Sequence, residues 1–199
     1  MSDLFQKKSV DYDANDRIKM RSLAISTCIK ENIQLHDQMQ IMDFGAGTGL
    51  ISTQLVPYVK QITAIDISES MLQKLIQKTE LNGKVQILCQ DLIQEPTGIE
   101  YDLIVSAMAL HHIEDTVSLI KRFHEHLKLG GQIAIADLDT EPGTFHSKGT
   151  EGIFHFGFNR DTLKKIFLGN GFSQIEFFTA HTEVKENVTY PIFLAVATK

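Results

Sequence analysis

The sequence predicts an α/β fold in which helices cover both faces of a mostly parallel sheet. Strand-like and helix-like apolar patterns alternate six times along the 199 residues, which is the pattern of repeated β-α units. A turn with glycines at alternate positions, residues 45–49, joins the first predicted strand directly to a helix. Acidic residues follow two later strands, and right-handed crossovers bring those strand ends to the sheet edge that carries the glycine turn.

The individual elements follow from the spacing of apolar residues. Helices are predicted where apolar residues recur every three or four positions, and strands where short β-branched runs are bounded by turn residues. Residues 1–13 show no periodicity. Glycines at 130 and 131, and at 169 and 171, end two of the helices. The predicted helices are 16–33, 50–58, 70–78, 116–127 and 160–168, and the predicted strands are 40–44, 61–66, 84–92, 101–107, 132–137, 172–179 and 188–197.

Composition limits the classes of protein to which the chain can belong. The length suits one domain, and contents of 43% hydrophobic and 22% charged residues are typical of a soluble globular protein. A net charge of −6 argues against nucleic acid as a partner. The apolar runs are too short for a membrane span, and the N-terminus lacks the apolar core of a signal peptide. Cys28 and Cys89 lie in apolar surroundings without metal-ligand spacing, so we expect buried free thiols in a cytoplasmic protein.

The glycine turn has the form D-x-G-x-G-x-G, from Asp43 to Gly49. The dinucleotide form G-x-G-x-x-G does not fit, because either frame puts Leu50 or Ser52 where the third glycine belongs. A phosphate-binding P-loop is excluded as well, because no Lys and Ser/Thr follow the last glycine. An acidic residue at the turn suits a ligand that carries an ammonium and a sulfonium group better than it suits a pyrophosphate.

This motif resembles the first motif of the class I S-adenosylmethionine-dependent methyltransferases, and the Gly130-Gly131 pair that opens a strand is similar to theirs. The resemblance is close over residues 36–140 and loose elsewhere. It implies a Rossmann-like, seven-stranded, mostly parallel sheet whose last strand is antiparallel. It also implies one methyltransferase domain over residues 1–199, with an N-terminal helical flap (1–35), a cofactor-binding core (36–140), a substrate-lid segment (138–157), and a C-terminal helix with closing strands (158–199).

Asp66 and Asp91 are the acidic residues at the two later strand ends. Asp66 lies 21 residues beyond Gly45, where a carboxylate can accept both ribose hydroxyls, although capping the next helix is an alternative role. The resemblance implies that Asp91 faces the adenine amine, with Ile67 and Leu92 as apolar walls. The cofactor contacts implied by the resemblance are Asp43, Gly45, Ala46, Gly47, Asp66, Ile67, Met71, Asp91, Leu92 and Ser106.

His111 is the first candidate for a general base, because it follows the fourth predicted strand on the substrate side. Its alternative role is to shape the pocket. Candidates for substrate contact are histidines of the lid and the strand end and two flap residues: His112, His146, His155, Tyr12 and Arg17. Each of them could instead be an ordinary packed or exposed side chain.

Asp137 and Asp139 end the fifth predicted strand and could hold a divalent ion, but the sequence offers no third oxygen ligand, so no metal is expected.

The sequence therefore predicts an enzyme that transfers a methyl group from S-adenosylmethionine to a small molecule by in-line displacement. Residues 107–109 lack the Asn/Asp-Pro-Pro-aromatic run with which resembled enzymes grip an amine, which argues against adenine-N6 or glutamine methylation. Two alternatives stay open: a nicotinamide-dependent oxidoreductase, and a non-catalytic cofactor-binding partner protein. The acceptor atom and the oligomeric state do not follow from the sequence.

Overall fold

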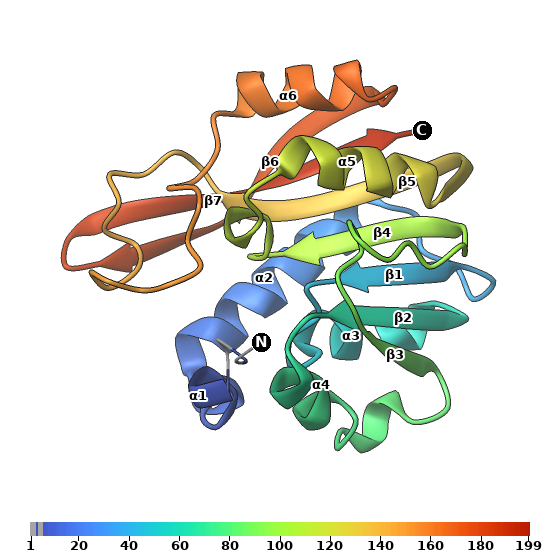
Figure 1. Ribbon diagram of the computed structural model, residues 1–199, viewed down its shortest axis with the longest axis horizontal. Helices are drawn as coiled ribbons and strands as arrows, with labels where there is room; N and C mark the ends of the chain where they lie inside the picture. The colour runs from blue at the N-terminus through green and yellow to red at the C-terminus, as the bar shows by residue number, and fades with distance from the viewer. Residues whose placement is uncertain (1–2, 4–5) are drawn as a thin grey trace.

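The computed structural model describes residue 3 and residues 6–199, without the side chains of residues 7 and 8. Residues 1, 2, 4 and 5 of the expected flap lie outside the described residues. Within the described part, seven strands form one sheet in the order β3-β2-β1-β4-β5-β7-β6 (Figure 1). The strands are β1 (Gln40–Phe44), β2 (Gln61–Asp66), β3 (Val85–Cys89), β4 (Tyr101–Ala107), β5 (Leu127–Leu138), β6 (Ser173–Lys185) and β7 (Val188–Thr198).

The direction of the strands confirms the predicted sheet. Strands β1 to β5 pair in parallel, whereas β7 runs antiparallel to both β5 and β6. In the parallel part, Asp66 pairs with Cys89, and Phe44 pairs with Ser106. The carboxyl ends of β1, β2, β3 and β4 therefore meet at one edge, which is the edge that the glycine turn occupies.

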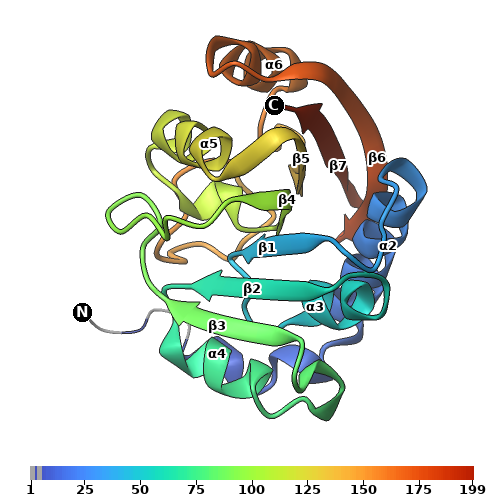
Figure 2. The same ribbon diagram turned by 90° about the vertical axis from the view of Figure 1, so that its right-hand side faces the viewer.

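Helices cover both faces of the sheet, as predicted (Figure 2). One face carries α2 (Asp16–Asn32), α3 (Leu50–Leu55) and α4 (Glu69–Leu75), and the other carries α5 (Thr116–Glu125) and α6 (Arg160–Gly169). Short turns of helix complete the fold: α1 (Gln6–Ser9), η1 (Tyr12–Ala14), η2 (Val56–Tyr58), η3 (Thr79–Leu81) and η4 (Leu110–His112). Among the described residues, no helix combines the length and the apolar character that a bilayer crossing requires.

Each face has its own hydrophobic core because each helix buries one apolar stripe. On the first face, Ile25 and Ile29 of α2 pack with the odd-numbered residues of β1, such as Ile41. On the second face, Phe123 of α5 meets Phe44 of β1 edge to face, with ring centroids 5.1 Å apart. Alternate residues of β1 thus point to opposite cores, so the sheet is buried on both sides.

The segment between β5 and α6 leaves the sheet and returns to it as a closed loop. The peptide N–H of Phe158 donates to the carbonyl of Leu138 at 2.8 Å, and the N–H of Glu141 donates to the carbonyl of Phe156 at 2.9 Å. Arg160 closes the base of the loop with two 2.7 Å hydrogen bonds to the Asp139 carboxylate. We call residues 139–159 the lid.

The lid packs against the end of the long β6–β7 hairpin (Figure 1). The Lys185 ammonium donates to the carbonyl of Phe145 at 3.0 Å, and the hydroxyls of Thr144 and Tyr190 lie 2.7 Å apart. The β6–β7 hairpin contacts the lid beyond the core. Its first strand ends at Lys185, whereas the sequence predicted an end at residue 179.

Several predicted bounds and one environment were wrong. Strand β5 begins at Leu127 and not at 132, because a bulge absorbs the glycines, and Gly130 has a left-handed φ of 76°. The helix predicted over 70–78 ends at Leu75, and the chain continues as η3. Residues 1–13, which showed no periodicity, include α1 and part of η1. Cys89 is exposed and not buried, because β3 is an edge strand.

The contact between Phe44 and Phe123 predicts a large difference between two sites on one helix. Phe123→Ala should lower the free energy of unfolding by about 3–5 kcal/mol, because it removes a fully buried ring from the second core. Val117→Ala, on the exposed side of α5, should change it by no more than about 0.5 kcal/mol. Urea unfolding measures both, and equal losses would contradict this description of the core.

Candidate functional site

The glycine turn follows β1 and is hydrogen-bonded to the end of β2. Gly45, Gly47 and Gly49 adopt left-handed φ angles of 65°, 54° and 81°, which residues with a Cβ adopt only with strain. The peptide N–H groups of Gly45 and Ala46 both donate to the carbonyl of Ile65, at 2.8 and 3.1 Å. The turn therefore sits across the tips of two strands, with its backbone facing outward from the sheet edge.

The three glycines have different reasons to lack a side chain. A Cβ on Gly45 would overlap the side chain of Ala109, and one on Gly49 would meet Leu75 at 2.7 Å. A Cβ on Gly47 would meet nothing within 4 Å. Open space beside the Gly47 backbone is what a ligand lying against the peptide requires.

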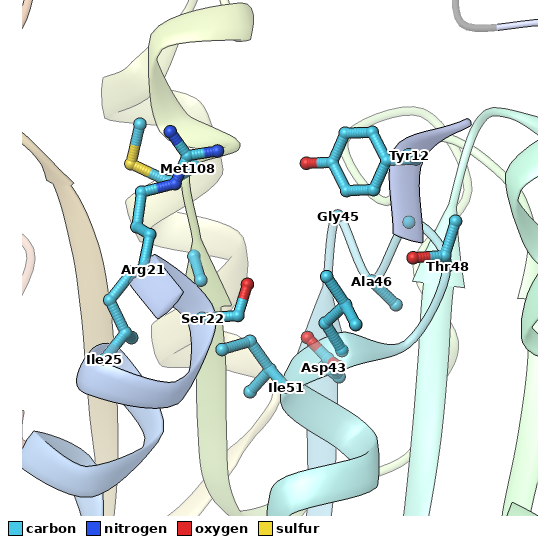
Figure 3. Close-up of a pocket in the computed structure, with 13 residues that line it drawn as sticks. Tyr12, Arg21, Ser22, Ile25, Asp43, Gly45, Ala46, Thr48, Ile51 and Met108 are labelled. Atoms are coloured by element: carbon cyan, nitrogen blue, oxygen red, sulfur yellow. The ribbon is translucent and has the colours of Figure 1, made fainter. Parts of the chain in front are cut away.

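A pocket opens above this turn, between the flap helix α2 and the end of β4 (Figure 3). Tyr12 and Arg21 point toward each other across its mouth, and Asp43 lies at its base. Its walls come from three segments that are distant in the sequence: Tyr12, Arg21, Ser22 and Ile25 of the flap; Asp43, Gly45, Ala46, Gly47 and Thr48 of the turn with Leu50 and Ile51 of α3; and Ala107 and Met108 at the end of β4.

Asp43 is a buried carboxyl at the base of the pocket. Its Oδ2 accepts a 2.6 Å hydrogen bond from the hydroxyl of Ser52 on α3. Burial raises the pKa of Asp43 to about 7, and the nearby negative charge of Asp66 adds to this rise. A cation bound beside Asp43 would favour its ionised form.

Asp66 joins the pocket to the neighbouring strand ends. Its carboxylate accepts from the N–H groups of Gly47 and Ser68, both at 2.8 Å. Burial raises the pKa of Asp66, although these two hydrogen bonds oppose the rise. Each carboxylate oxygen has a second lone pair, so the group can accept two further hydrogen bonds from a ligand. Among the described residues, neither Asp43 nor Asp66 forms an ion pair with a cationic side chain.

The surface next to Asp66 carries the residues predicted to hold an adenine ring. Ile67 is 63% exposed, and Asp91 is an exposed turn residue whose Oδ1 accepts from the N–H of Ile93 at 2.9 Å. The exposed Cys89 thiol lies 3.8 Å from the Ile67 carbonyl. The structure thus brings Asp66, Ile67 and Asp91 to one stretch of the sheet edge.

Three predicted cofactor contacts have buried side chains and lie outside the pocket lining. Leu92 lies inside the second core, and Met71 is buried on α4. Ser106 is buried as well, and among the described residues its hydroxyl is one of the few buried polar groups without a hydrogen-bond partner. A role for Leu92 as an exposed apolar wall does not fit this placement.

The flap supplies Tyr12 to the pocket, but Arg17 is exposed and outside it. Arg21, one helical turn later, lines the pocket instead and is only 8% exposed. Sequence reasoning missed it. The available signal was its spacing, because Ile25 and Ile29 follow at i+4 and i+8 and extend the buried stripe of α2 to Arg21.

Two acidic contacts hold Arg21 and the flap in place. The Arg21 guanidinium donates to Glu183 of β6 at 3.0 Å. Asp13 accepts from the Thr48 hydroxyl at 2.6 Å and pairs with the Lys78 ammonium at 2.8 Å. Burial raises the pKa of Tyr12, which lies between these contacts, while the charge of Arg21 acts in the opposite direction. The flap is therefore tied both to the glycine turn and to the β6–β7 hairpin.

A group of histidines lies beyond the end of β4. Two of them belong to η4, and two belong to the lid that packs against it. Nδ1 of His111 lies 2.8 Å from Oδ1 of Asp137, and its Nε2 lies 3.2 Å from Nε2 of His146 on the lid. His112 Nδ1 lies 2.6 Å from the Gly152 carbonyl. His155 is directed elsewhere in the lid, because its Nε2 lies 2.9 Å from the Ile113 carbonyl.

Asp137 and Asp139, the residues considered for a divalent ion, are engaged by His111 and Arg160 respectively.

Comparison with known proteins places this geometry in a family. Residues 42–133 match the family model described as a methyltransferase domain. The chain is 30% identical over 149 residues to an uncharacterised methyltransferase of Geobacillus sp. (strain WCH70). This match covers 67% of this chain and 69% of that protein. It is 32% identical over 155 residues to an uncharacterised methyltransferase of Schizosaccharomyces pombe, covering 69% of this chain and 55% of that protein. The chain thus spans about half the length of the fission-yeast relative.

Among solved structures, the N-methyltransferase NodS of Bradyrhizobium japonicum, in complex with S-adenosylhomocysteine, is similar in fold. The TM-score is 0.74 at 17% sequence identity, and the match covers all of this chain and 99% of that chain.

The glycine turn predicts unequal effects of two alanine substitutions. Gly45→Ala and Gly47→Ala both force a left-handed φ on alanine, which costs about 1–2 kcal/mol. Gly45→Ala should cost about 1–3 kcal/mol more, because its Cβ overlaps the Ala109 side chain, whereas the Cβ of Gly47→Ala enters open space. Urea unfolding of both variants measures the difference, and equal losses would contradict the packing described for Gly45.

The raised pKa of Asp43 predicts a pH-dependent stability. Between about pH 4 and pH 7 the folded protein holds a proton at Asp43 that the unfolded chain has lost. This contribution, up to about 4 kcal/mol, is present in full below about pH 4 and is lost as the pH rises to about 7. Asp43→Asn should therefore gain stability relative to the wild type over this range.

The control for Asp43→Asn is Asp16→Asn, which changes an exposed carboxylate on α2. Its stability should follow the pH dependence of the wild type. Identical pH profiles for the wild type and Asp43→Asn, measured by urea unfolding from pH 4 to pH 8, would show that Asp43 is not protonated in the folded protein.

Proposed function

Because this chain belongs to the class I S-adenosylmethionine-dependent methyltransferases, we propose that it transfers the cofactor's sulfonium methyl group to a small-molecule acceptor. The family uses S-adenosylmethionine, and NodS, which shares the fold, was solved with its demethylated form. The observation that best supports a role for this particular site is a pair of carboxyls next to an open glycine backbone: the buried Asp43 and the half-buried Asp66, which accepts from the N–H of Gly47.

The chemistry of this site fits the cofactor. Burial raises the pKa of both carboxyls, and neither has a cationic partner among the described residues, so a ligand with an ammonium and a sulfonium group supplies the missing positive charge. The backbone at Gly47 leaves room for the ligand, and Asp66 retains lone pairs for ribose hydroxyls. Ile67 and Asp91 lie beyond Asp66, where the adenine ring would extend.

Arg21 and Tyr12 have complementary roles at the pocket mouth. Arg21 is a buried cation that faces the pocket, and its pairing with Glu183 through one nitrogen leaves other guanidinium N–H groups for a ligand carboxylate. We propose that Arg21, rather than Arg17, meets the cofactor's carboxylate, and that Tyr12 covers the pocket against water.

The bound cofactor supplies an activated methyl group on sulfur, so the protein's work is alignment, exclusion of water and, for a protonated acceptor, removal of a proton. The flap lines the pocket, and the lid packs against His111 beyond the end of β4, which suits the first two tasks. His111 is the proposed proton acceptor, because Asp137 fixes its ring and orients Nε2 toward the lid.

Calorimetry with S-adenosylhomocysteine tests the proposal directly. The wild type should bind it, and Asp66→Ala should weaken binding about 10- to 100-fold, because hydrogen bonds to a charged group are lost. Asp66→Asn should fall between the two, and Asp16→Ala, which removes an exposed carboxylate, should bind like the wild type.

Absence of binding at millimolar ligand would reject the proposed function. Unchanged affinity in Asp66→Ala, with the variant's folding checked by its melting temperature, would remove that residue from the site.

A further inference from the structure

The two ring nitrogens of His111 face partners of different kinds. Nδ1 lies 2.8 Å from Asp137, and the peptide N–H of His111 donates to the other Asp137 oxygen at 3.1 Å. Nε2 lies 3.2 Å from Nε2 of His146, which belongs to the lid. A carboxylate on β5, an imidazole after β4 and an imidazole on the lid thus form a continuous hydrogen-bonded row.

The carboxylate fixes where the protons lie in this row. Burial alone would raise the pKa of Asp137, but the charge and hydrogen bond of His111 hold it below its ordinary value. Both Asp137 oxygens also accept peptide N–H groups, from His111 at 3.1 Å and from Leu138 at 2.7 Å, so the carboxylate acts as the acceptor for Nδ1–H of His111. In neutral His111, Nε2 is then the acceptor, and the proton between the two rings belongs to His146. His112, whose ring centroid lies 4.2 Å from that of His111, also faces the pair.

Burial decides which imidazole an acceptor molecule can reach. His111 is 1% exposed and Asp137 is fully buried, whereas His146 is only partly buried. His146 is therefore the imidazole of this pair that an outside molecule can reach. Its Nε2 lies 3.2 Å from Nε2 of His111, close enough to pass a proton on to it.

We propose that His146 and His111 act together as the proton acceptor of the reaction, with His146 as the catalytic residue that meets the methyl acceptor, and that this acceptor is a hydroxyl on an aromatic ring. The inference rests on the proposed function and deepens it. Asp137 is a positioning residue, because it acts through His111.

The step balances without any further reactant. A lone pair of the acceptor oxygen forms the new O–CH₃ bond while the electrons of the S–CH₃ bond go to sulfur, which loses its charge. The hydroxyl proton passes to His146, and the Nε2 proton of His146 passes to His111. The resulting imidazolium lies against the ionised Asp137 and later releases its proton to solvent.

Acid strength points to the class of acceptor. An imidazole with a pKa of about 6.5 cannot take a proton from an aliphatic alcohol to a useful extent, but a phenol, with a pKa of about 10, is within its range during methyl transfer. A carboxylate acceptor would not need a base at all.

The lid also offers aromatic surface beside the histidines. Phe154 and Phe156 are 51% and 57% exposed, and the N–H of Phe154 donates to the His111 carbonyl at 3.0 Å. Phe145, which precedes His146, is buried with its ring edge-on to the His146 ring. Exposed rings at this position suit an acceptor that has a ring of its own.

Transfer of a tritiated methyl group from S-adenosylmethionine to a series of 4-substituted phenols tests the proposal. The phenols range from 4-methoxyphenol, which keeps its proton at pH 8, to 4-nitrophenol, which is largely ionised there. The wild type is compared with His146→Asn and His146→Gln, and His36→Asn, an exposed histidine far from the lid, is the control.

For 4-methoxyphenol, both His146 variants should lose about 100-fold or more in kcat. For 4-nitrophenol the loss should be much smaller, because the proton is already gone. A merely structural role of His146 would lower both rates equally. His36→Asn should match the wild type throughout, and unchanged affinity for S-adenosylhomocysteine shows that a variant is folded.

The outcomes separate this inference from the proposed function. An equal loss for both phenols, or no loss, would overturn the role of His146. Binding of S-adenosylhomocysteine with transfer to benzylamine but to none of the phenols would overturn the acceptor class. Failure of the wild type to bind S-adenosylhomocysteine would instead reject the proposed function itself.

Discussion

The hydrogen bonds that fasten the glycine turn to the tip of β2 are the constraint on which the rest of the site depends. Two N–H groups of the turn share the Ile65 carbonyl, and a third, from Gly47, is held by Asp66. This arrangement fixes an open stretch of backbone next to a carboxylate. The arrangement requires glycine. These positions have left-handed φ angles, and a side chain at position 45 would overlap Ala109.

Around this centre, hydrogen bonds and ion pairs hold the flap and the lid in place. Asp13 links the flap to Thr48 of the turn, and Arg21 links it to Glu183 of the hairpin. The lid is closed at its base by Asp139 and Arg160, and it meets the strand ends through its histidine. The cofactor site and the lid are thus both held to the same sheet and hairpin.

The sequence predicted the sheet and the helices on both faces, because periodicity and glycine punctuation are local signals, whereas the antiparallel last strand followed from the family resemblance. It also located the carboxyls, since parallel strands align their ends. It did not find Arg21, because Arg17 has the same chemistry and only the phase of α2 separates them. The pairing of His111 with Asp137 escaped it as well, because that contact joins residues 26 positions apart through tertiary packing.

The most direct measurement of the central claim is a crystal structure of the full chain with S-adenosylhomocysteine. The homocysteine part should lie between Tyr12 and Arg21, with its amino group near Asp43 and the ribose hydroxyls on the Asp66 carboxylate. A ligand bound away from the glycine turn, or one that leaves both carboxyls without contact, would contradict it.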